Sequence, residues 1–485
     1  MKKTIRILSL ALALLLESSL FLSCASDRNE GVTPSDTHEA APGTEETVQK
    51  ETETELAVDD LETVNLNGAD YIIAGLSNRT THAVTSSELN GEAINDAQYN
   101  AARTVEERFN VTISYEDIAT DDSSMSTAIK GLVSGGEDKY AVTFGVDTQQ
   151  ISLSLSGQYY NLKNIPQFNF DQPWWTDSTD TIGIGDKSYV ASSYLSYYCL
   201  YYIRLLVMNK DIAAQFNIEV PYEQVFEGNW YLDDLIELAS VATIDTNGDG
   251  TMNSEDMYGI SYEVLYTLQN SMGITIISKD ADNIPYLAFD IDRAGKYLEK
   301  VENLCDNYGY LDGGYGANFF AQNQSLFCYC NLREVCNIIR DTDINYGYLP
   351  APKLDELQED YMTVATDVYW GIPTTNVAKL DMIGTVTEAL SCQHFNHVRP
   401  AFYETTMKSK LSGNENDIKV LDIVAEHLNI DFAYAYQSTL GTISAFDDLY
   451  RDTVTSDTLA STYKKSEKSI SKGLNKLIEK FADLP

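Results

Sequence analysis

The feature that most limits the fold of this chain is an alternation of strand and helix patterns near its beginning. ADYIIAGL (69–76) is a short apolar run, and apolar side chains recur at helical spacing in residues 95–110. The alternating run VTISYED follows, then SMSTAIKGLVSGG, which has the composition of a helix that ends at Gly135, and then KYAVTFGVD. The order strand, helix, strand, helix, strand predicts a parallel α/β layer.

The rest of the chain continues as a mixed α/β pattern without a repeat of fixed period, which argues against solenoids and propellers. We expect an extended stretch at 187–212, helices near 231–242, 292–306 and 376–393, and strands at 325–330 and 345–349. The final KSEKSISKGLNKLIEKFADLP has the pattern of an amphipathic helix. Its apolar residues, which we expect to dock on the body, are Ile470, Leu474, Leu477, Ile478 and Phe481. The alternative is a helix that binds a partner.

The net charge of the chain excludes one class of function. The length of 485 residues allows roughly two to three domains. The chain has 73 acidic and 33 basic residues, which give a formal net charge of −40. A polyanion of this kind repels nucleic acid and anionic lipid head groups, so we exclude DNA and RNA binding. The charge suits a soluble protein outside the cytoplasm.

Residues 1–23 have the pattern of a signal peptide. A basic start precedes Ile7 to Leu16, an apolar run too short to span a bilayer. The segment ends in FLSC, which resembles a bacterial lipobox, although Phe21 stands where that pattern usually has Leu. In a lipobox, Cys24 is lipidated and becomes the first residue of the mature protein. The alternative is an ordinary signal peptide that is cut nearby.

An acidic tether is predicted for residues 24–65. Residues 25 to about 65 are rich in Glu, Asp, Thr, Pro and Ala with almost no aromatic side chains, which indicates a disordered, self-repelling segment. No other segment of the sequence has the pattern of a membrane span. We therefore expect a body held by lipid at the extracytoplasmic face of the cell membrane, without a segment that crosses the bilayer.

The six cysteines that remain after Cys24 do not predict a zinc site. None has CxxC spacing, and the chain has only 5 His. Cys328 and Cys330 are two residues apart, so both sulfurs would face the same side of a strand, and their apolar neighbours favour buried free thiols. Disulfides remain an open alternative outside the cytoplasm, because the spacing specifies no pairing.

One loop has the spacing of a twelve-residue calcium site. DTNGDGTMNSED (245–256) places oxygen side chains at every second position and puts Gly250 at position 6, where the chain must turn sharply. The predicted ligands are Asp245, Asn247, Asp249, the backbone carbonyl of Thr251, Asn253 and Asp256. Asp256 stands where sensor loops usually carry a bidentate Glu, which favours a structural Ca²⁺. The alternative is a turn without metal.

Four segments, in their order along the chain, resemble one protein family. They are AQYNAARTVEERFNVTISYED, VMNKDIAAQFNIEVPYEQVFEGNWYLDDLIELA, the loop DTNGDGTMNSEDMYGI, and INYGYLPAPKLDELQEDY with VYWGIPTT after it. The second is the most specific, because a strand ending in Asn-Lys, a helix, a loop with Pro and a Trp follow one another. From Ala69 to about Tyr450 the chain resembles the extracellular solute-binding proteins of bacterial ABC importers, of the carbohydrate type and similar to their family 1.

The resemblance implies an α/β fold of the periplasmic-binding-protein type, with two lobes, hinge-crossing strands and a ligand cleft. Lobe one would comprise residues 66–195 and 358–405, and lobe two residues 196–357 and 406–485. The crossovers would lie near Tyr194 and Trp370. The implied function is that of a monomeric, non-catalytic receptor that captures a carbohydrate, an oligosaccharide in particular, and delivers it to ABC permease subunits.

The residues that would bind the sugar are predicted from their places at crossovers and strand ends. A sugar offers hydroxyl groups and apolar C–H faces, so its site needs aromatic platforms with carboxylates, amides and Arg. The predicted residues are Trp370, Asp147, Tyr194, Tyr197, Asn331, Arg333 and Asp367. Trp370 would stack on a sugar ring, and Asp147, at the carboxyl end of a strand, would accept a hydroxyl proton.

Each of these residues has a structural alternative. Trp370 would otherwise pack in the core, Asp147 would form a turn or a cap, and Arg333 would form an ion pair. Trp174 and Trp175 in DQPWWTD are weaker candidates for the site, and Trp230 is expected in the core.

The main competing class is a surface enzyme that processes carbohydrate. Such an enzyme needs two placed carboxylates, but 73 acidic residues always supply some pair, so this argument has no force. The sequence has no GxSxG and no HExxH, and its scattered His give no triad. A receptor for peptides or amino acids and a sugar-capture protein without a transporter remain alternatives.

Overall fold

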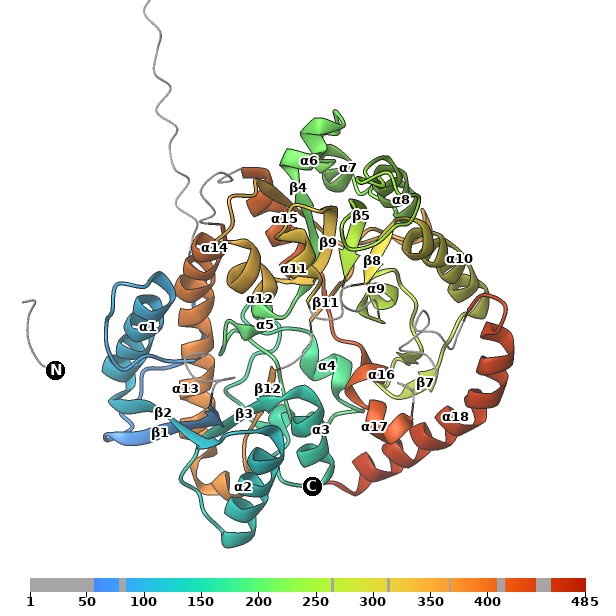
Figure 1. Cartoon of the computed structure of the whole chain (residues 1–485). Helices are drawn as coiled ribbons and strands as arrows, with labels where there is room; N and C mark the ends of the chain where they lie inside the picture. Colours follow the sequence, from blue (N-terminus) through green and yellow to red (C-terminus); the bar gives the residue numbers. More distant parts are fainter. Residues whose placement is uncertain are drawn as a thin grey trace, which may run out of the picture. The chain divides into compact units, whose positions relative to one another are not determined.

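Figure 1 shows the structure, a computed structural model that describes residues 56–77, 84–262, 266–311, 315–365, 368–407, 415–441 and 455–485. Every described residue belongs to one compact unit, Glu55–Pro485. The predicted signal peptide, Cys24 and Asp367 lie outside the described residues. Among the residues that are described, no helix combines the length and the apolar composition that a membrane span requires.

The first sheet has four strands and confirms the alternation predicted near the beginning of the chain. Its order is β12-β3-β1-β2, with β1 (Ala69–Leu76), β2 (Val111–Ala119), β3 (Val142–Val146) and β12 (Val368–Gly371). β1 is parallel to β2 and β3, and β12 is antiparallel to β3. The helices α1 (Ala93–Phe109) and α2 (Asp122–Gly135) connect the parallel strands. Gly136 ends α2 with a φ of 70°, a conformation that favours glycine.

The second sheet has five strands in the order β10-β4-β9-β5-β8. They are β4 (Arg204–Asn209), β5 (Tyr258–Tyr262), β8 (Gly309–Leu311), β9 (Ser325–Asn331) and β10 (Tyr346–Leu349). β5 is parallel to β8 and β9, while β4 is antiparallel to β9 and β10. The predicted strands at 325–330 and 345–349 are confirmed. The helices predicted near 231–242 and 292–306 are also confirmed, as α8 (Leu232–Val241) and α10 (Ile291–Tyr308).

The extended stretch predicted at 187–212 is wrong in part. The structure forms a one-turn helix, α5 (Tyr198–Tyr201), then β4, and then α6 (Lys210–Gln215). α6 begins where it does because the side chain of Asn209 accepts hydrogen bonds from the backbone N–H groups of Asp211 and Ile212, both at 3.0 Å. A short apolar run does not reveal by its period whether it is helix or strand. The helix predicted at 376–393 divides into a 3₁₀ turn, η3 (Thr374–Lys379), and α13 (Leu380–Gln393).

The other elements are mostly short. The helices are α3 (Asp147–Leu155), α4 (Ser178–Ile182), α7 (Tyr222–Phe226), α9 (Tyr266–Ser271), α11 (Gly316–Phe320), α12 (Leu332–Glu334), α14 (Arg399–Met407), α15 (Glu415–Glu426), α16 (Phe432–Ala435) and α17 (Gln437–Leu440). The strands are β6 (Ile277–Lys279), β7 (Pro285–Leu287), β11 (Thr363–Val364) and β13 (Leu428–Asn429). Further 3₁₀ and π turns are η1 (Leu162–Asn164), η2 (Val335–Ile339) and η4 (His394–Val398).

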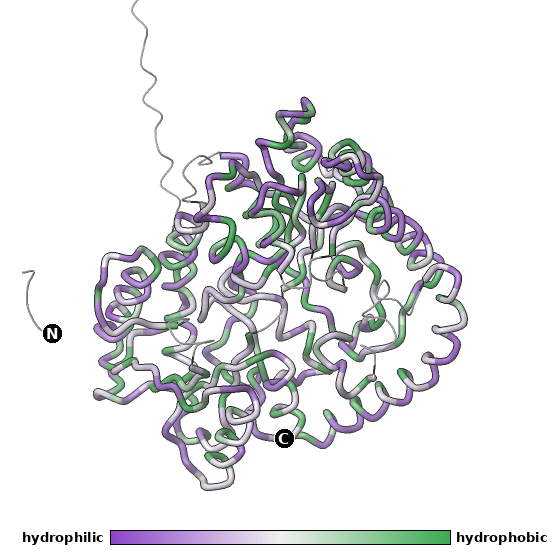
Figure 2. The backbone as a smooth tube through the Cα atoms, in the orientation of Figure 1, coloured by the Kyte–Doolittle hydropathy of each residue, from purple (hydrophilic) through white to green (hydrophobic). Residues whose placement is uncertain are grey.

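The C-terminal helix α18 (Leu459–Asp483) docks on the body, as predicted. Its apolar stripe is buried at Ile470, Leu474, Leu477 and Phe481 and partly buried at Ile478, and Figure 2 shows hydrophobic and hydrophilic residues alternating along it. The end of the helix is held as well. Lys187 donates through Nζ to the carbonyl oxygens of Phe481 at 3.1 Å and Ala482 at 3.2 Å, in the last turn of the helix, where a positive charge is favourable.

Tryptophan and cysteine fill the interior. Trp230 is fully buried and its indole N–H donates to the carbonyl oxygen of Pro350 at 3.2 Å, so its predicted place in the core is confirmed. The six cysteines of the described residues are free and buried. Cys328 and Cys330 lie in β9, all seven residues of which are buried.

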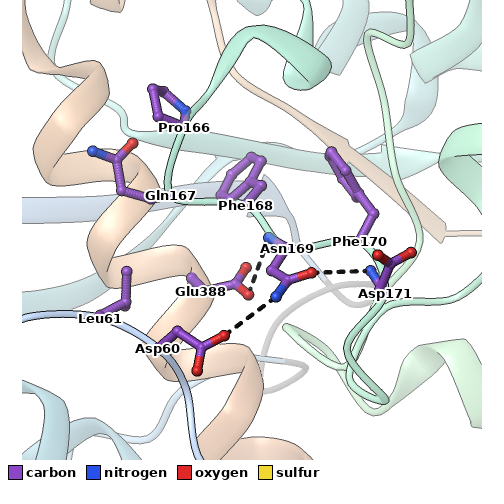
Figure 3. A pocket seen from close by; sticks show the side chains of 9 residues that line it. All are labelled: Asp60, Leu61, Pro166, Gln167, Phe168, Asn169, Phe170, Asp171 and Glu388. Carbon is purple, nitrogen blue, oxygen red and sulfur yellow. Dashed lines mark hydrogen bonds between the residues drawn. The ribbon is translucent and has the colours of Figure 1, made fainter.

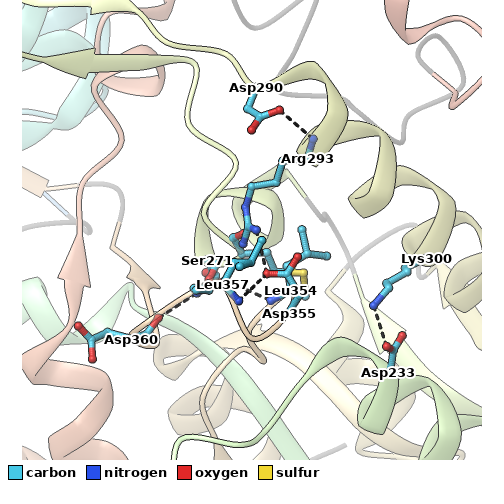
Figure 4. A network of polar contacts seen from close by, with 11 residues as sticks. Asp233, Ser271, Asp290, Arg293, Lys300, Leu354, Asp355, Leu357 and Asp360 are labelled. Atoms are coloured by element: carbon cyan, nitrogen blue, oxygen red, sulfur yellow. Dashed lines mark hydrogen bonds and ion pairs between the residues drawn. The ribbon is translucent and has the colours of Figure 1, made fainter.

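A polar network ties α10 to its neighbours (Figure 4). Arg293 donates to the carboxylate of Asp355 at 2.9 Å and to the carbonyl oxygen of Met272 at 3.0 Å. Lys300 of the same helix donates to Asp233 of α8 at 2.7 Å. These contacts fix the segment that leaves β10 before the chain returns to the first sheet.

Candidate functional site

The parallel strands of both sheets end close to the segments that link the sheets. In the first sheet, β3 ends at Val146, which pairs with Val368 at the start of β12. In the second sheet, β9 ends at Asn331, which pairs with Arg204 at the start of β4. β12 and β4 each follow a linking segment, so the carboxyl ends of β3 and β9 both lie where the chain passes between the sheets.

The first linking segment, residues 191–203, pairs with the second, of which the structure describes residues 363–365, and with β12 after it. Antiparallel bridges join Ala191 to Trp370 and Ile203 to Ala365, and β11 also pairs in parallel with β13. We call these segments and the adjoining strand ends the junction. Ligands of open α/β sheets bind outside the carboxyl ends of the strands, so the junction is the candidate ligand site.

Two carboxylates and two phenols lie together at the end of β3. This acid–tyrosine cluster consists of Asp147, Tyr369, Asp431 and Tyr436, all of them buried. Burial raises the pKa of Tyr369, and the nearby groups Asp147, Tyr436 and Asp431 raise it further. Burial also raises the pKa of Asp431 to about 6, even though its carboxylate accepts the backbone N–H of Tyr434 at 2.6 Å. The cluster therefore holds two carboxylates and two phenols in a dry environment.

Two sequence features position the acid–tyrosine cluster. Asp147 is the first residue of α3, directly after β3, and its carboxylate accepts the N–H of Thr148 at 2.5 Å. Asp431 caps the N-terminus of α16, which packs against α3 and α4. The Tyr436 hydroxyl donates to the carbonyl oxygen of Ile182 at 2.6 Å, which fixes α16 to the end of α4.

A second group, the tyrosine cluster, surrounds α5. Its members are Tyr197, Tyr198, Tyr201, Tyr202 and Tyr315. The rings of Tyr198 and Tyr201 are stacked with centroids 5.0 Å apart and planes at 18°, and Tyr197 stands edge-on to Tyr198 at 4.9 Å. Tyr197, Tyr198 and Tyr201 are half-buried and Tyr315 is exposed. Aromatic faces are therefore accessible at the junction.

Polar side chains border the tyrosine cluster. The guanidinium of Arg333 lies 5.7 Å from the ring centre of Tyr315, and its positive charge acts on the phenols of Tyr201 and Tyr202. The amide of Asn337 donates to the Tyr201 hydroxyl at 3.1 Å. Aromatic faces with a guanidinium and an amide beside them are the combination that recognises a sugar.

The structure gives Trp370 no open face. Its side chain is fully buried, its ring lies 5.9 Å from that of Trp175 and 6.1 Å from that of Phe168, and its indole N–H donates to the Ser193 hydroxyl at 3.1 Å. These contacts are those of a core residue, the alternative recognised from the sequence.

Tyr194 is also buried, and it lines a pocket of about 270 Å³ with residues from both sides of the junction. Its ring stands edge-on to Phe395 at 5.1 Å. Arg399 lies over both rings and donates to Asp422 at 2.9 Å. Glu426, at the end of α15, also lines the pocket.

Of the predicted ligand residues, the structure brings Tyr197 into the tyrosine cluster, Arg333 beside that cluster and Asp147 into the acid–tyrosine cluster. Asn331 caps α12 by accepting the backbone N–H of Glu334 at 2.9 Å, and so orients the turn that carries Arg333. Sequence analysis missed Tyr198, Tyr201, Tyr202, Tyr315, Asn337, Tyr369, Asp431 and Tyr436. The run YYCLYY could have indicated the first three, whereas no local pattern marks Asp431.

The pair Trp174 and Trp175 serves a different group. Both are buried, and their indole N–H groups donate to the two carboxylate oxygens of Glu388, each at 3.0 Å. Burial raises the pKa of Glu388 to about 7. Glu388 borders a pocket of about 500 Å³, seen in Figure 3, in which it lies beside Asn169 and near Asp60. This pocket belongs to the first-sheet side of the molecule and not to the junction.

The loop 245–256 folds around hydrogen bonds from its oxygen side chains to its own backbone. Asp245 accepts the N–H groups of Gly248 and Gly250, both at 2.7 Å, and the buried Asp256 accepts those of Thr246 at 2.9 Å and Asn253 at 2.8 Å. In the described part of the chain, no three His, Cys, Asp or Glu side chains gather in a group that could hold a metal ion. The ligand set predicted for this loop also includes two amides and a backbone carbonyl.

Comparison with known proteins shows the fold. No family model matches the chain, and no curated protein matches it in sequence. An uncharacterized protein of Listeria monocytogenes, lmo0859, is similar in structure with a TM-score of 0.57 and 13% identity, over 83% of this chain and 99% of that one. A sugar transporter of Rhizobium etli in an open conformation is similar with a TM-score of 0.53 and 13% identity, over 86% of this chain and 100% of that one.

A third similar structure is the ABC substrate-binding protein Lmo0181 of Listeria monocytogenes in complex with cycloalternan. Its TM-score is 0.52 and its identity 13%, over 84% of this chain and 100% of that one. The chain therefore has the α/β fold of the periplasmic-binding-protein type that the sequence predicts. At this level of identity the similarity concerns the fold and not the ligand.

Proposed function

We propose that the chain is a substrate-binding lipoprotein of an ABC transporter that captures a carbohydrate, an oligosaccharide in particular, and delivers it to permease subunits. The observation that carries the proposal is the tyrosine cluster, whose half-buried rings lie beside Arg333 and Asn337 at the carboxyl end of β9. Accessible rings stack on the C–H faces of sugars, and the polar side chains take up hydroxyl groups.

The charge at the junction favours a neutral, hydroxylated solute over an anion. Asp147 and Asp431 are buried in the acid–tyrosine cluster, and their carboxylates would repel a phosphate or a free carboxylate. Their oxygens would accept hydrogen bonds from any sugar hydroxyl that reaches the end of β3. The similar structures of a sugar transporter and of a protein bound to cycloalternan support the same ligand class.

The proposed activity is binding without chemistry. In a receptor the two sides of the junction hold the ligand and release it again, and neither cluster acts as a nucleophile or a general acid. The alternatives are a receptor for another small solute, such as a peptide or an amino acid, and a surface enzyme that processes carbohydrate.

A ligand screen tests this function. The full chain, with Ca²⁺ present, is screened by thermal shift against mono- and oligosaccharides, amino acids and polyamines, and hits are measured by calorimetry. We expect an oligosaccharide to bind, and Tyr201→Ala to weaken its binding at least tenfold, about 1.4 kcal/mol. The matched control is Tyr286→Ala, which removes an exposed ring in β7, outside the junction.

The outcomes separate the candidate functions. Binding of amino acids or peptides alone would contradict the carbohydrate proposal and keep the receptor. Release of cleaved sugar during incubation would contradict the receptor and favour the enzyme. Equal losses of affinity in Tyr201→Ala and Tyr286→Ala would contradict the assignment of the site to the tyrosine cluster.

We also propose that the loop 245–256 holds a structural Ca²⁺. Asp245, Asn247, Asp249, the carbonyl of Thr251, Asn253 and Asp256 would hold it. The residues fit a hard cation in chemistry, because all are oxygen donors, and Ile244 and Met257 already join the two ends of the loop. The ion would stabilise the turn between α8 and β5 and would take no part in sugar binding.

Lipidation of Cys24 at the extracytoplasmic face of the cell membrane completes the proposal. It is supported by the FLSC sequence and by the acidic composition of residues 25–55. The tether predicted to extend to about residue 65 is shorter than expected, because Asp59 is buried on the body and pairs with Arg108 at 2.7 Å. The body would act as a monomer at the end of this tether and meet the permease there.

A further inference from the structure

The exposed face of α18 carries a row of lysines in a chain of net charge −40. Lys464, Lys468, Lys472 and Lys476 recur at every fourth position, and Lys465 lies beside them. We call these five residues the lysine stripe. All of them are exposed. The stripe is about 18 Å long at a rise of 1.5 Å per residue.

The lysine stripe lies opposite the docked face of the helix. Lys472 is two residues from Ile470 and two from Leu474, both of which are buried, so it points about 200° around the helix from each. Glu467, Glu479 and Asp483 are the acidic residues of α18. Glu479 and Asp483 follow the stripe, so the part from Lys468 to Lys476 carries positive charge alone.

Several cations of the body form ion pairs. Lys139, for instance, pairs with Glu116 at 2.6 Å, and Lys379 with Asp138 at 3.0 Å. Among the residues that the structure describes, no ion pair includes a lysine of α18. The charge of the stripe is therefore not neutralised by the body.

The body holds the stripe in place. The buried residues on the opposite face dock α18, the ring of Phe289 lies 5.2 Å from that of Tyr463 at the beginning of the helix, and Lys187 binds the carbonyl groups at its end. A fixed row of positive charge fits a planar, negatively charged surface better than a flexible tail does, because little entropy is lost on contact.

We propose that the lysine stripe docks the body on the anionic head groups of the membrane that carries it. The net charge of −40 repels this membrane at long range. At contact, however, screening limits the field to about 8 Å at physiological ionic strength, so the head groups interact with the stripe and not with distant acids. The proposal rests on the lipid anchor proposed above.

The length of the tether makes this contact sterically accessible. Thirty-one residues, 25–55, separate Cys24 from the described body. At 3.3–3.6 Å per residue they can reach at most about 110 Å, so any face of the body can turn toward the bilayer. Attraction at the surface therefore decides which face does so, and the stripe would leave the junction free to take up ligand.

Lysine acetylation, read residue by residue by mass spectrometry, tests the proposal. The full chain is mixed at low salt with vesicles of phosphatidylglycerol or of phosphatidylcholine. We expect Lys468, Lys472 and Lys476 to react at least fivefold more slowly with phosphatidylglycerol than with phosphatidylcholine. This difference should vanish in about 0.5 M salt, where the Debye length is only about 4 Å. Lys130, exposed on α2, should react equally with both lipids.

Two variants with the same change in net charge test whether binding depends on the lysine stripe or only on the net charge of the protein. In the chain with Cys24→Ser, which no lipid anchor can hold on the vesicles, Lys468→Gln, Lys472→Gln and Lys476→Gln together should abolish co-sedimentation with phosphatidylglycerol vesicles. The control, Lys130→Gln with Lys296→Gln and Lys419→Gln, changes three exposed lysines outside α18 and should retain it. Equal binding by both variants, or equal acetylation with both lipids, overturns the proposal. Protection seen only on native membranes and not on pure lipid also overturns it and indicates a protein partner.

The experiments distinguish a failure of the proposed lipid anchor from a failure of the proposed docking by the lysine stripe. If Cys24 is not lipidated, the purified chain carries no acyl mass, yet the stripe still binds phosphatidylglycerol vesicles at low salt. If the stripe does not dock, the lipidated chain stays on vesicles of both lipids and its lysines react alike.

Discussion

Ala191 and Trp370 exchange both of their backbone hydrogen bonds, each with an N···O distance of 2.9 Å. Ala191 lies in the first segment that links the sheets and Trp370 in β12, which follows the second, and the Trp370 indole adds a third bond, to the hydroxyl of Ser193. The first linking segment is therefore hydrogen-bonded to the strand that follows the second.

Removing the hydroxyl of Ser193 should destabilise the protein without affecting its ligand site. Ser193→Ala leaves the fully buried indole N–H of Trp370 without its partner, which costs about 1–3 kcal/mol. Trp370→Phe removes the donor as well, so in the double variant the substitution of Ser193 should cost much less. Chemical denaturation of the two single variants and the double variant measures this coupling. A tenfold loss of sugar affinity in Ser193→Ala at full stability would instead place Ser193 in the site.

Glu388 should make stability fall as pH rises toward neutral. Burial raises its pKa from 4.5 to about 7, so the native state holds the proton more tightly than the unfolded chain. Unfolding between these values releases that proton, and the free energy of unfolding decreases with rising pH by roughly 1–3 kcal/mol. In Glu388→Gln this part of the slope should disappear. The raised pKa of Asp431, about 6, has the same sign over a lower range and remains in the variant.

Denaturation curves between pH 5 and 8 measure the effect, and tryptophan emission supplies a direct signal. Trp174 and Trp175 donate to the carboxylate that titrates, so native emission should change with a midpoint near the pKa of Glu388, about 7. An emission titration that Glu388→Gln leaves unchanged would assign the signal to another group.

Calcium should raise the melting temperature of the native chain by several degrees relative to chelator, because a ligand that binds only the folded state stabilises it by mass action. Asp249→Ala should abolish this difference and leave sugar affinity unchanged. Asp282→Ala, in an exposed turn outside the loop, should behave like the unsubstituted protein. Identical melts with calcium and with chelator would remove the metal from this loop.

Cys24→Ser should release the protein from the cell envelope into the medium. A palmitate analogue supplied during growth should label the unsubstituted chain and not the variant, since the thiol is the site of acylation in a lipobox. An unsubstituted chain that fractionates as freely secreted would show that FLSC does not act as a lipobox.

The order of the elements could be predicted from the sequence because it depends on local patterns. The alternation of apolar residues in β1, β2 and β3, the helical spacing in α1, and the Gly ending of α2 are each set within a few residues. The buried stripe of α18 is a pattern of the same kind. The place of Asp147 at the end of β3 could also be predicted, because the residue directly follows the apolar run of that strand.

Contacts between distant segments decided the rest. Trp370 was predicted to stack on a sugar ring, yet the rings of Phe168 and Trp175 pack against it in the core. The positions of Phe168 and Trp175 in the sequence do not predict this contact. Tyr201 acquires its polar neighbours only when α5 packs beside the turn after β9. Local periodicity specifies which face of an element is apolar, but the segment that covers this face depends on how the whole chain packs. The sequence by itself therefore determined the elements of the fold. The tertiary structure decided which aromatic rings stay accessible.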